Sequence, residues 1–288
     1  MELRPEMPYD RFKFLKIRVD RHVAFVTIDN PPINILNGPL LVEFNRFALK
    51  VANDDDVKVI VFDSADPDFF IAHFDVEVLS KAPSQAPPKS KQLSGMHPLC
   101  ENFRTMPKVT IAKIEGRCRG GGSEFVLALD MRFGAVGKAI LAQPEISVGI
   151  IPGGGSTQRL PRLLGRSRAL EIVLSGMDIS AEMAERYGYI NRALPPDELT
   201  PFIENLAYRI ATYPAETIAL AKKAVLTAEE LPLLEGLLEE TYLFNQSIAL
   251  PAAKELMKLF LEKGGQTREV EQDFSKLLEE LDKIKKTK

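Results

Sequence analysis

Three consecutive glycines, Gly120 to Gly122, stand just before a carboxylate, Glu124, in the stretch RGGGSEF. Glycine lets a backbone approach a ligand closely, and the first N–H groups of a helix have no partner within that helix. A glycine-rich turn at the start of a helix can therefore donate hydrogen bonds to an anion. The same turn can also serve only to allow tight packing, and the glycines alone leave both interpretations open.

A phosphate group is the first anion to consider, and the neighbouring residues argue against it. A P-loop needs Lys followed by Ser or Thr after its last glycine, whereas Ser123 and Glu124 follow here. The dinucleotide pattern G-x-G-x-x-G also fails on spacing. The sequence therefore argues against phosphate. Two interpretations stay open: a turn that only allows tight packing, and a turn that stabilises an oxyanion, a negative charge that forms only during a reaction.

Two glutamates accompany the glycine-rich segments. Glu124 follows the first triple, and Glu145, in QPEISVG, precedes a second triple, Gly153 to Gly155, in IPGGGSTQRL. The residues around both glutamates are mostly apolar, and a buried carboxylate is costly unless it is paired or functional. We interpret them as a candidate acid/base pair. The alternatives are a first-turn glutamate interacting with the helix dipole at Glu124 and a turn carboxylate at Glu145.

The apolar pattern predicts an α/β protein that positions these groups. FKFLKIRVD and HVAFVTIDN are typical of a β-hairpin, the spacing from Leu40 to Val51 predicts a helix, and VKVIVF predicts a buried strand. This alternation indicates partly parallel pairing. Phe125 to Leu129 is apolar on all sides and predicts a buried helix. From about Pro161 the pattern is nearly all helical, and it ends in a charged amphipathic helix from Arg268 to Lys288.

The stretch from Ser80 to Ser94 is rich in Pro, Ser and Lys. It predicts a mobile surface loop, because the strand pattern resumes afterwards in KVTIAKIEG. We therefore do not interpret it as a linker between domains.

Composition narrows the class of protein. The chain has 288 residues, a formal net charge of −3, two cysteines and no tryptophan. No block of Lys and Arg interleaves with aromatic residues, so the sequence favours no nucleic-acid partner. Two cysteines make no disulfide framework, and the apolar runs are shorter than a membrane span. The N-terminus has no pattern typical of a targeting segment. We expect a cytoplasmic protein with no nucleic-acid or membrane partner.

KIEGRCRGGGSEFVLALDMRFGA and LAQPEISVGIIPGGGSTQRL together resemble the enoyl-CoA hydratase/isomerase family, also called the crotonase superfamily. The resemblance runs from the NPPINILN loop into the helical C-terminus. It implies a catalytic core of ββα units wound in a spiral, residues 1–200, and a helical C-terminal region, residues 201–288. That region implies a homotrimer or a dimer of trimers. The substrate would be an acyl-CoA, with coenzyme A part of the substrate and no separate cofactor or metal.

The resemblance also assigns residues to an oxyanion hole. Gly121 would supply one backbone amide and Phe74 the other, and Ala72, His73, Phe74 and Gly121 would contact the acyl-CoA. Two departures from the family pattern stand nearby. His73 replaces a usual glycine, and Glu77 stands where a lysine near the CoA phosphates is common.

For the reaction itself, the resemblance implies that Glu124 and Glu145 hold a water and move its protons. Glu145 would donate the proton to the α-carbon, and the amide of Gly153 would help to position the water. The expected activity is hydration of a 2-enoyl-CoA to a 3-hydroxyacyl-CoA. The alternatives are another reaction of the family (isomerisation, C–C cleavage or dehalogenation) and a non-catalytic acyl-CoA-binding protein, because a fold does not fix a function.

Overall fold

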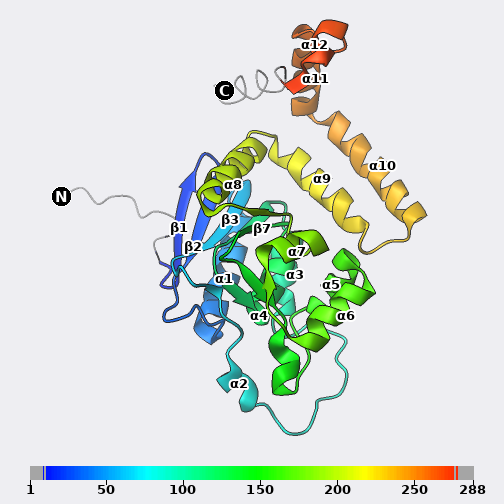
Figure 1. Ribbon diagram of the computed structural model, residues 1–288. Coiled ribbons are helices and arrows are strands. Elements are labelled where there is room, and N and C mark those ends of the chain that lie inside the picture. The colour runs from blue at the N-terminus through cyan, green and yellow to red at the C-terminus, as the bar shows by residue number, and fades with distance from the viewer. Residues whose placement is uncertain (1–8, 10, 276, 278–288) are drawn as a thin grey trace, which may run out of the picture.

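The computed structural model describes residue 9, residues 11–275 and residue 277 (Figure 1). Two sheets form its centre. The larger contains, in spatial order, β1 (Leu15–Asp20), β2 (Val23–Ile28), β3 (Val59–Ser64), β5 (Val109–Ile114), β7 (Met131–Ala135) and β10 (Arg192–Leu194). The smaller contains β4 (Phe69–Ile71), β6 (Arg117–Arg119), β8 (Ile140–Ala142) and β9 (Ile179–Ser180). The α/β fold predicted from the sequence is confirmed.

Successive strands alternate between the two sheets. β3, β5 and β7 lie in the larger sheet, and the strand that follows each of them, β4, β6 and β8, lies in the smaller one. Neighbouring strands from β2 to β10 pair in parallel in the larger sheet. The chain therefore advances as repeated strand–strand–helix units, as a spiral of ββα units requires.

The predicted hairpin is also confirmed. β1 and β2 pair antiparallel, with Leu15 opposite Ile28 and Asp20 opposite Val23. The turn residues Arg21 and His22 both have positive φ, 47° and 64°. Two central residues of positive φ characterise the tight turns whose twist matches that of the flanking strands.

Helix α1 (Gly38–Ala52) contains the predicted helix and turns one apolar face inward. Its first turn is capped by Asn37, whose side chain accepts a hydrogen bond from the Leu40 N–H. Its buried apolar residues are Leu40, Phe44, Phe47, Ala48 and Val51. The following helices of the first half are α2 (Val76–Ser80), which ends where the predicted loop begins, and α3 (His97–Thr105), which the sequence pattern did not predict.

Helix α4 (Gly121–Leu127) begins earlier than the predicted segment, since the glycines form its first turn and Gly120, with φ 48°, caps it. Every residue of α4 is buried. Its Phe125 ring packs against Phe44 and Phe62, with ring centroids 4.7 Å and 5.3 Å away. This aromatic cluster fixes the helix, and therefore the position of its N-terminus.

The second half of the chain is mainly helical, as predicted. Its helices are α5 (Ser156–Leu164), α6 (Arg166–Ser175), α7 (Ala181–Tyr187), α8 (Pro196–Ala211), α9 (Ala215–Thr227), α10 (Leu233–Ala249), α11 (Pro251–Glu262) and α12 (Arg268–Gln272). Leu199 and Ile203 of α8 pack on the larger sheet, whereas α10 to α12 extend away from both sheets (Figure 1).

Two predictions about the C-terminal part are not tested by the structure. Residue 200, the predicted limit of the core, lies within α8, and the division into two regions stays a prediction. Of the predicted terminal helix, α12 covers Arg268–Gln272, while residues 276 and 278–288 lie outside the described residues.

Candidate active site

A cavity of about 390 Å³ lies between the loop of residues 72–75, the start of α4 and the 3-10 helix η1 (Pro144–Val148). Its lining includes most of the residues singled out from the sequence: His73, Phe74, Gly121, Glu124, Glu145 and Gly153. Ala72 instead is buried beside the cavity, where its N–H donates to the Ile33 carbonyl at 3.3 Å. Ala72 as an acyl-CoA contact therefore stays a prediction.

The backbone of Phe74 is positioned by the Pro/Asn-rich loop before α1. The Leu36 N–H donates to the His73 carbonyl at 2.9 Å, and the Asp75 N–H donates to the Leu36 carbonyl at 3.1 Å. Leu36 and Phe74 thus form an isolated parallel β-bridge, in which the residues on either side of Phe74 make the hydrogen bonds to Leu36. The N–H of Phe74 itself therefore points away from Leu36. The side away from Leu36 faces the start of α4.

Gly121 brings a second amide to the same place. A Cβ built on Gly121 would lie 2.9 Å from the Phe74 Cβ and 3.3 Å from the Phe74 nitrogen, so any side chain would displace the loop. As the first residue of α4, Gly121 has an N–H with no acceptor inside the helix. Two amides remote in sequence therefore lie together at one end of the cavity.

Glu124 is 3% exposed and is held by the second glycine cluster. Its Oε1 accepts hydrogen bonds from the N–H groups of Gly154, at 2.6 Å, and Ser156, at 3.2 Å. A Cβ on Gly154 would lie 2.6 Å from Glu124 Oε2, so glycine is required there. Burial raises the pKa of Glu124 above its ordinary value, and the two amides oppose this rise because they stabilise the carboxylate.

Glu145 is half-buried on η1 and is held less firmly. Its Oε2 is buried and has no hydrogen-bond partner among the described residues. Burial, with a smaller contribution from the charge of Glu124, raises the pKa of Glu145 to about 7. Near neutral pH this carboxyl group can therefore carry a proton and donate it.

The other predicted residues lie around this pair. Gly153 lines the cavity, and a Cβ on it would meet no atom within 4 Å. Its predicted role toward a water stays a prediction. The His73 Nδ1 lies 2.8 Å from the Phe74 carbonyl oxygen, so this nitrogen carries the proton and donates. Glu77 is exposed and pairs with Lys81 at 2.6 Å.

Sequence reasoning missed two residues that support the site. Ser156 supplies the second amide to Glu124, and Arg159 donates from Nη1 to the Gly154 carbonyl at 3.1 Å. The signal that could have found them is the repeated glycine triple, which indicates a second close approach of backbone to side chain. Among the described residues, no three His, Cys, Asp or Glu side chains are grouped as a metal ion would require.

The cavity thus combines a carboxylate held by amides, a carboxyl group of raised pKa and the neighbouring backbones of Phe74 and Gly121. Such a site can perform acid/base chemistry on a substrate that develops an oxyanion. Residues 18–269 match the family model for enoyl-CoA hydratase/isomerase, and the chain belongs to this family. The predicted family and the predicted class of enzyme, a hydratase-like lyase, are confirmed.

Comparisons with individual proteins agree with this assignment. The chain is 34% identical over 242 residues to "Probable enoyl-CoA hydratase, mitochondrial" of Dictyostelium discoideum, covering 84% of this chain and 85% of that one. It is 35% identical over 243 residues to the mitochondrial enoyl-CoA hydratase of Pongo abelii, covering 84% and 81%. The crystal structure of enoyl-CoA hydratase from Bacillus anthracis superposes with a TM-score of 0.79 at 27% identity, covering 87% and 97%.

Proposed function

We propose that this protein hydrates a 2-enoyl-CoA to a 3-hydroxyacyl-CoA. The observation that carries the proposal is that Glu124 and Glu145 line one cavity together with the Phe74 and Gly121 backbone. Relatives named enoyl-CoA hydratases support it. This set provides a base, an acid and two oxyanion donors, which addition of water to a conjugated thioester needs.

The two amides act on the thioester oxygen. When water adds to the β-carbon, electrons move through the double bond to the carbonyl, and the oxygen becomes an enolate oxyanion. The N–H groups of Phe74 and Gly121 donate to this oxygen and stabilise the transition state more than the ground state. Removal of one such donor typically costs about 3 to 4 kcal/mol.

The two glutamates move the protons. Glu124, as a carboxylate, accepts one proton of the water while the water oxygen bonds to the β-carbon. Glu145, as the acid, donates its proton to the α-carbon, and the enolate returns to a thioester. One proton then passes from Glu124 back to Glu145 before the next turnover. Both carboxyl groups act from one side of the substrate, so the addition is syn, and coenzyme A enters only as part of the substrate.

The test is hydration of crotonyl-CoA by the purified protein, followed as loss of the absorbance of the conjugated thioester. Glu124→Gln and Glu145→Gln should each lower kcat by about 10²- to 10⁴-fold, the range typical of acid/base catalysis. Glu171→Gln is the matched control and should keep full activity, because Glu171 is an exposed residue of α6 whose carboxylate accepts from the Tyr187 hydroxyl at 3.0 Å. Full activity in both glutamine variants of the pair would show that the roles are wrong.

A second assay separates the alternative functions. Mass spectrometry of a panel of acyl-CoA substrates distinguishes water gained from unchanged mass and from loss of a fragment. Hydration predicts the first result, isomerisation the second, and C–C cleavage or dehalogenation the third. A non-catalytic binding protein predicts acyl-CoA binding by calorimetry without any turnover.

We also propose a homotrimer or a dimer of trimers. The support is a row of exposed apolar side chains on α10, which a single chain leaves in water. They are Leu233, Leu234, Leu237, Leu238, Tyr242 and Phe244. None of the helices in the described part of the chain combines the length and apolar character that a membrane crossing needs. The cytoplasmic location stays a prediction.

A further inference from the structure

The second glycine triple lies between two charged side chains of opposite sign. On one side, a Cβ on Gly154 would meet the carboxylate of Glu124. On the other side, Gly155 has a φ of 123°, and a Cβ on it would overlap the Arg159 Nη1. A side chain at Gly154 would therefore meet the Glu124 carboxyl group, while at Gly155 the positive φ itself favours glycine.

The peptide backbone of Gly154 connects these two side chains. Its N–H donates to Glu124 Oε1 at 2.6 Å, and its carbonyl accepts from Arg159 Nη1 at 3.1 Å. The other terminal nitrogen of the guanidinium, Nη2, donates to Glu101 Oε1 at 2.7 Å. Because the guanidinium is planar and rigid, these contacts fix its orientation together.

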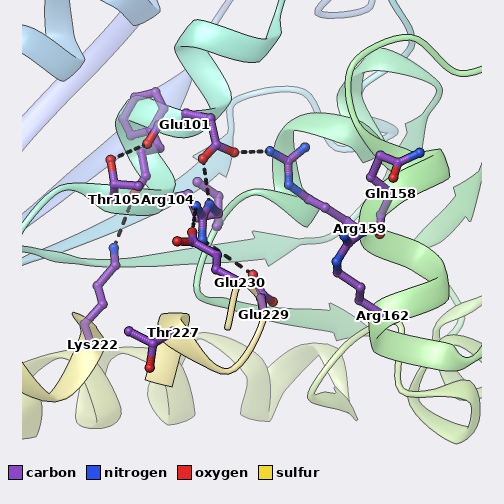
Figure 2. A network of polar contacts seen from close by, with 12 residues as sticks. Glu101, Arg104, Thr105, Gln158, Arg159, Arg162, Lys222, Thr227, Glu229 and Glu230 are labelled. Carbon is purple, nitrogen blue, oxygen red and sulfur yellow. Dashed lines mark hydrogen bonds and ion pairs between the residues drawn. The ribbon is translucent and has the colours of Figure 1, made fainter. Parts of the chain in front are cut away.

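Glu101 is itself fixed by a wider network, which Figure 2 shows. Its Oε2 accepts from Arg104 Nε at 2.8 Å. Arg104 also pairs with Glu230 at 2.5 Å and Glu229 at 3.5 Å, in the turn between α9 and α10. The Arg104 and Arg159 side chains are each only 15% exposed. A network of such charges holds its geometry better than an isolated surface pair does.

We propose that Arg159 is a positioning residue for Glu124. It holds the Gly154 carbonyl so that the N–H of the same residue stays directed at the Glu124 carboxylate. Arg159 acts only through this turn and not on the acyl-CoA. The proposal deepens the function proposed above and rests on it, since it names what keeps the base of the hydration reaction in place.

Titratable groups near Glu124 must be considered when its pKa is measured. His97 and Cys100 face it from α3, and Glu145 faces it from η1. Burial raises the pKa of the Cys100 thiol to about 12, so Cys100 stays neutral. If the amide contacts weaken, the carboxylate form of Glu124 loses stabilisation, and its pKa rises further. Loss of the Arg159 charge alone would also raise this pKa, so a lysine variant, which keeps the positive charge, is needed to isolate the effect of positioning.

The experiment compares Arg159→Gln with Arg159→Lys and with a matched control, Arg162→Gln. Arg162 lies on the same helix, and its Nη1 donates to the Gln158 carbonyl at 2.7 Å. Crotonyl-CoA hydration gives kcat and KM across a pH range. A carbon-13 NMR titration of glutamate carboxyl groups, assigned with Glu124→Gln, gives the pKa of Glu124 without any need for turnover.

We expect Arg159→Gln to lower kcat about 10- to 100-fold with little change in KM, as a small misplacement of a catalytic group does. The acid limb of its pH profile and the NMR titration of Glu124 should both move to higher pH. Arg159→Lys should recover part of the loss, because one ammonium can reach one of the two partners. Arg162→Gln should behave as the wild type.

The outcomes distinguish this inference from the proposed function. A wild-type protein that hydrates no enoyl-CoA overturns the proposed function, whereas the NMR titration still tests the hold of Arg159 on Glu124. An unchanged Glu124 titration in Arg159→Gln overturns the inference, as does an unchanged kcat. If Arg159→Gln does not fold, as judged by circular dichroism, the same comparison with Arg159→Lys decides.

Discussion

At the scale of single residues, the two glutamates differ in what surrounds them. Glu124 accepts two backbone hydrogen bonds, while the buried Oε2 of Glu145 has no partner among the described residues. Burial raises the pKa of both carboxyl groups. Backbone amides of the second glycine cluster oppose the rise at Glu124, whereas at Glu145 only its own backbone amide opposes it. This difference favours Glu124 as the base and Glu145 as the acid.

The pH dependence of hydration should follow from this assignment. Glu145 must be protonated to donate, so kcat/KM should fall about tenfold per pH unit above its pKa of about 7. Glu124 must be ionised to accept a proton, so kcat/KM should also fall on the acid side. Initial rates with crotonyl-CoA across buffers of matched ionic strength give the profile. A rate that stays constant from pH 6 to 9, about two units above the pKa, contradicts the role of Glu145.

The oxyanion hole can be tested at Gly121. In Gly121→Ala, the new Cβ would lie 2.9 Å from the Phe74 Cβ and would separate the two amides. We expect kcat to fall about 10²- to 10³-fold, as when an oxyanion donor is lost. Gly38→Ala is the control, because a Cβ on Gly38 meets no atom within 4 Å. Near-normal kcat in a folded Gly121→Ala protein would rule out the assigned pair of amides.

At the scale of elements, helix α4 depends on its close approach to β4. A Cβ on Gly122 would lie 2.6 Å from the Ile71 carbonyl oxygen and 2.7 Å from the Ile71 Cβ. The contact between α4 and β4 therefore leaves no room for a side chain at Gly122. The same contact determines how far the N-terminus of α4 reaches into the cavity. The glycines of the first triple have separate tasks, since Gly120 caps the helix, Gly121 faces Phe74 and Gly122 contacts β4.

Gly122→Ala should therefore destabilise the protein, although alanine favours a helix by about 1 kcal/mol. Overpacking of a closed contact costs about 1 to 3 kcal/mol, and here it meets backbone that cannot move aside easily. Urea unfolding should show a lower free energy of unfolding than for the wild type. Gly38→Ala, in open space, should change it little. Equal unfolding midpoints for the two variants would contradict this account of α4.

At the scale of the whole molecule, the helical arm from α10 to α12 stands apart from the sheets (Figure 1). Leu233 is 80% exposed and Leu234 is 71% exposed on its first helix. Several large apolar side chains exposed on one helix are typical of a surface that another chain covers. The turn before α10 also carries Glu229 and Glu230, so the arm joins the network that ends at Arg159.

Leu234→Asp should disrupt the proposed oligomer, because it places a charge within the apolar row. Light scattering after gel filtration should give the wild type a mass about three or six times the 32.1 kDa of one chain, and the variant a lower mass. Glu240→Gln, at an exposed polar residue of the same helix, should leave the mass unchanged. A wild-type protein that is monomeric at micromolar concentration would refute the proposed trimer.

Much of the local structure was predictable because it depends on residues close in sequence. The spacing of Leu41, Phe44 and Phe47 predicted α1, and the alternation on either side of the turn at Arg21 predicted the hairpin. Helix α3 escaped prediction because it is short, with Leu99, Cys100 and Phe103 as its buried residues. Helix α5, the first helix of the second half, begins at Ser156, earlier than the predicted start near Pro161, which lies inside it.

The sequence by itself determined which groups are available: two glycine triples, two glutamates in apolar surroundings and the motif that relates them to a family. Only the tertiary structure decided that the Gly154 amide meets Glu124, that Phe74 meets Gly121, and that Arg159 supports the turn. The physical reason is that hydrophobic periodicity reports how each element is buried. Contacts between backbone groups that are distant in sequence depend instead on how successive ββα units pack against one another. That packing involves whole elements, which local periodicity does not report.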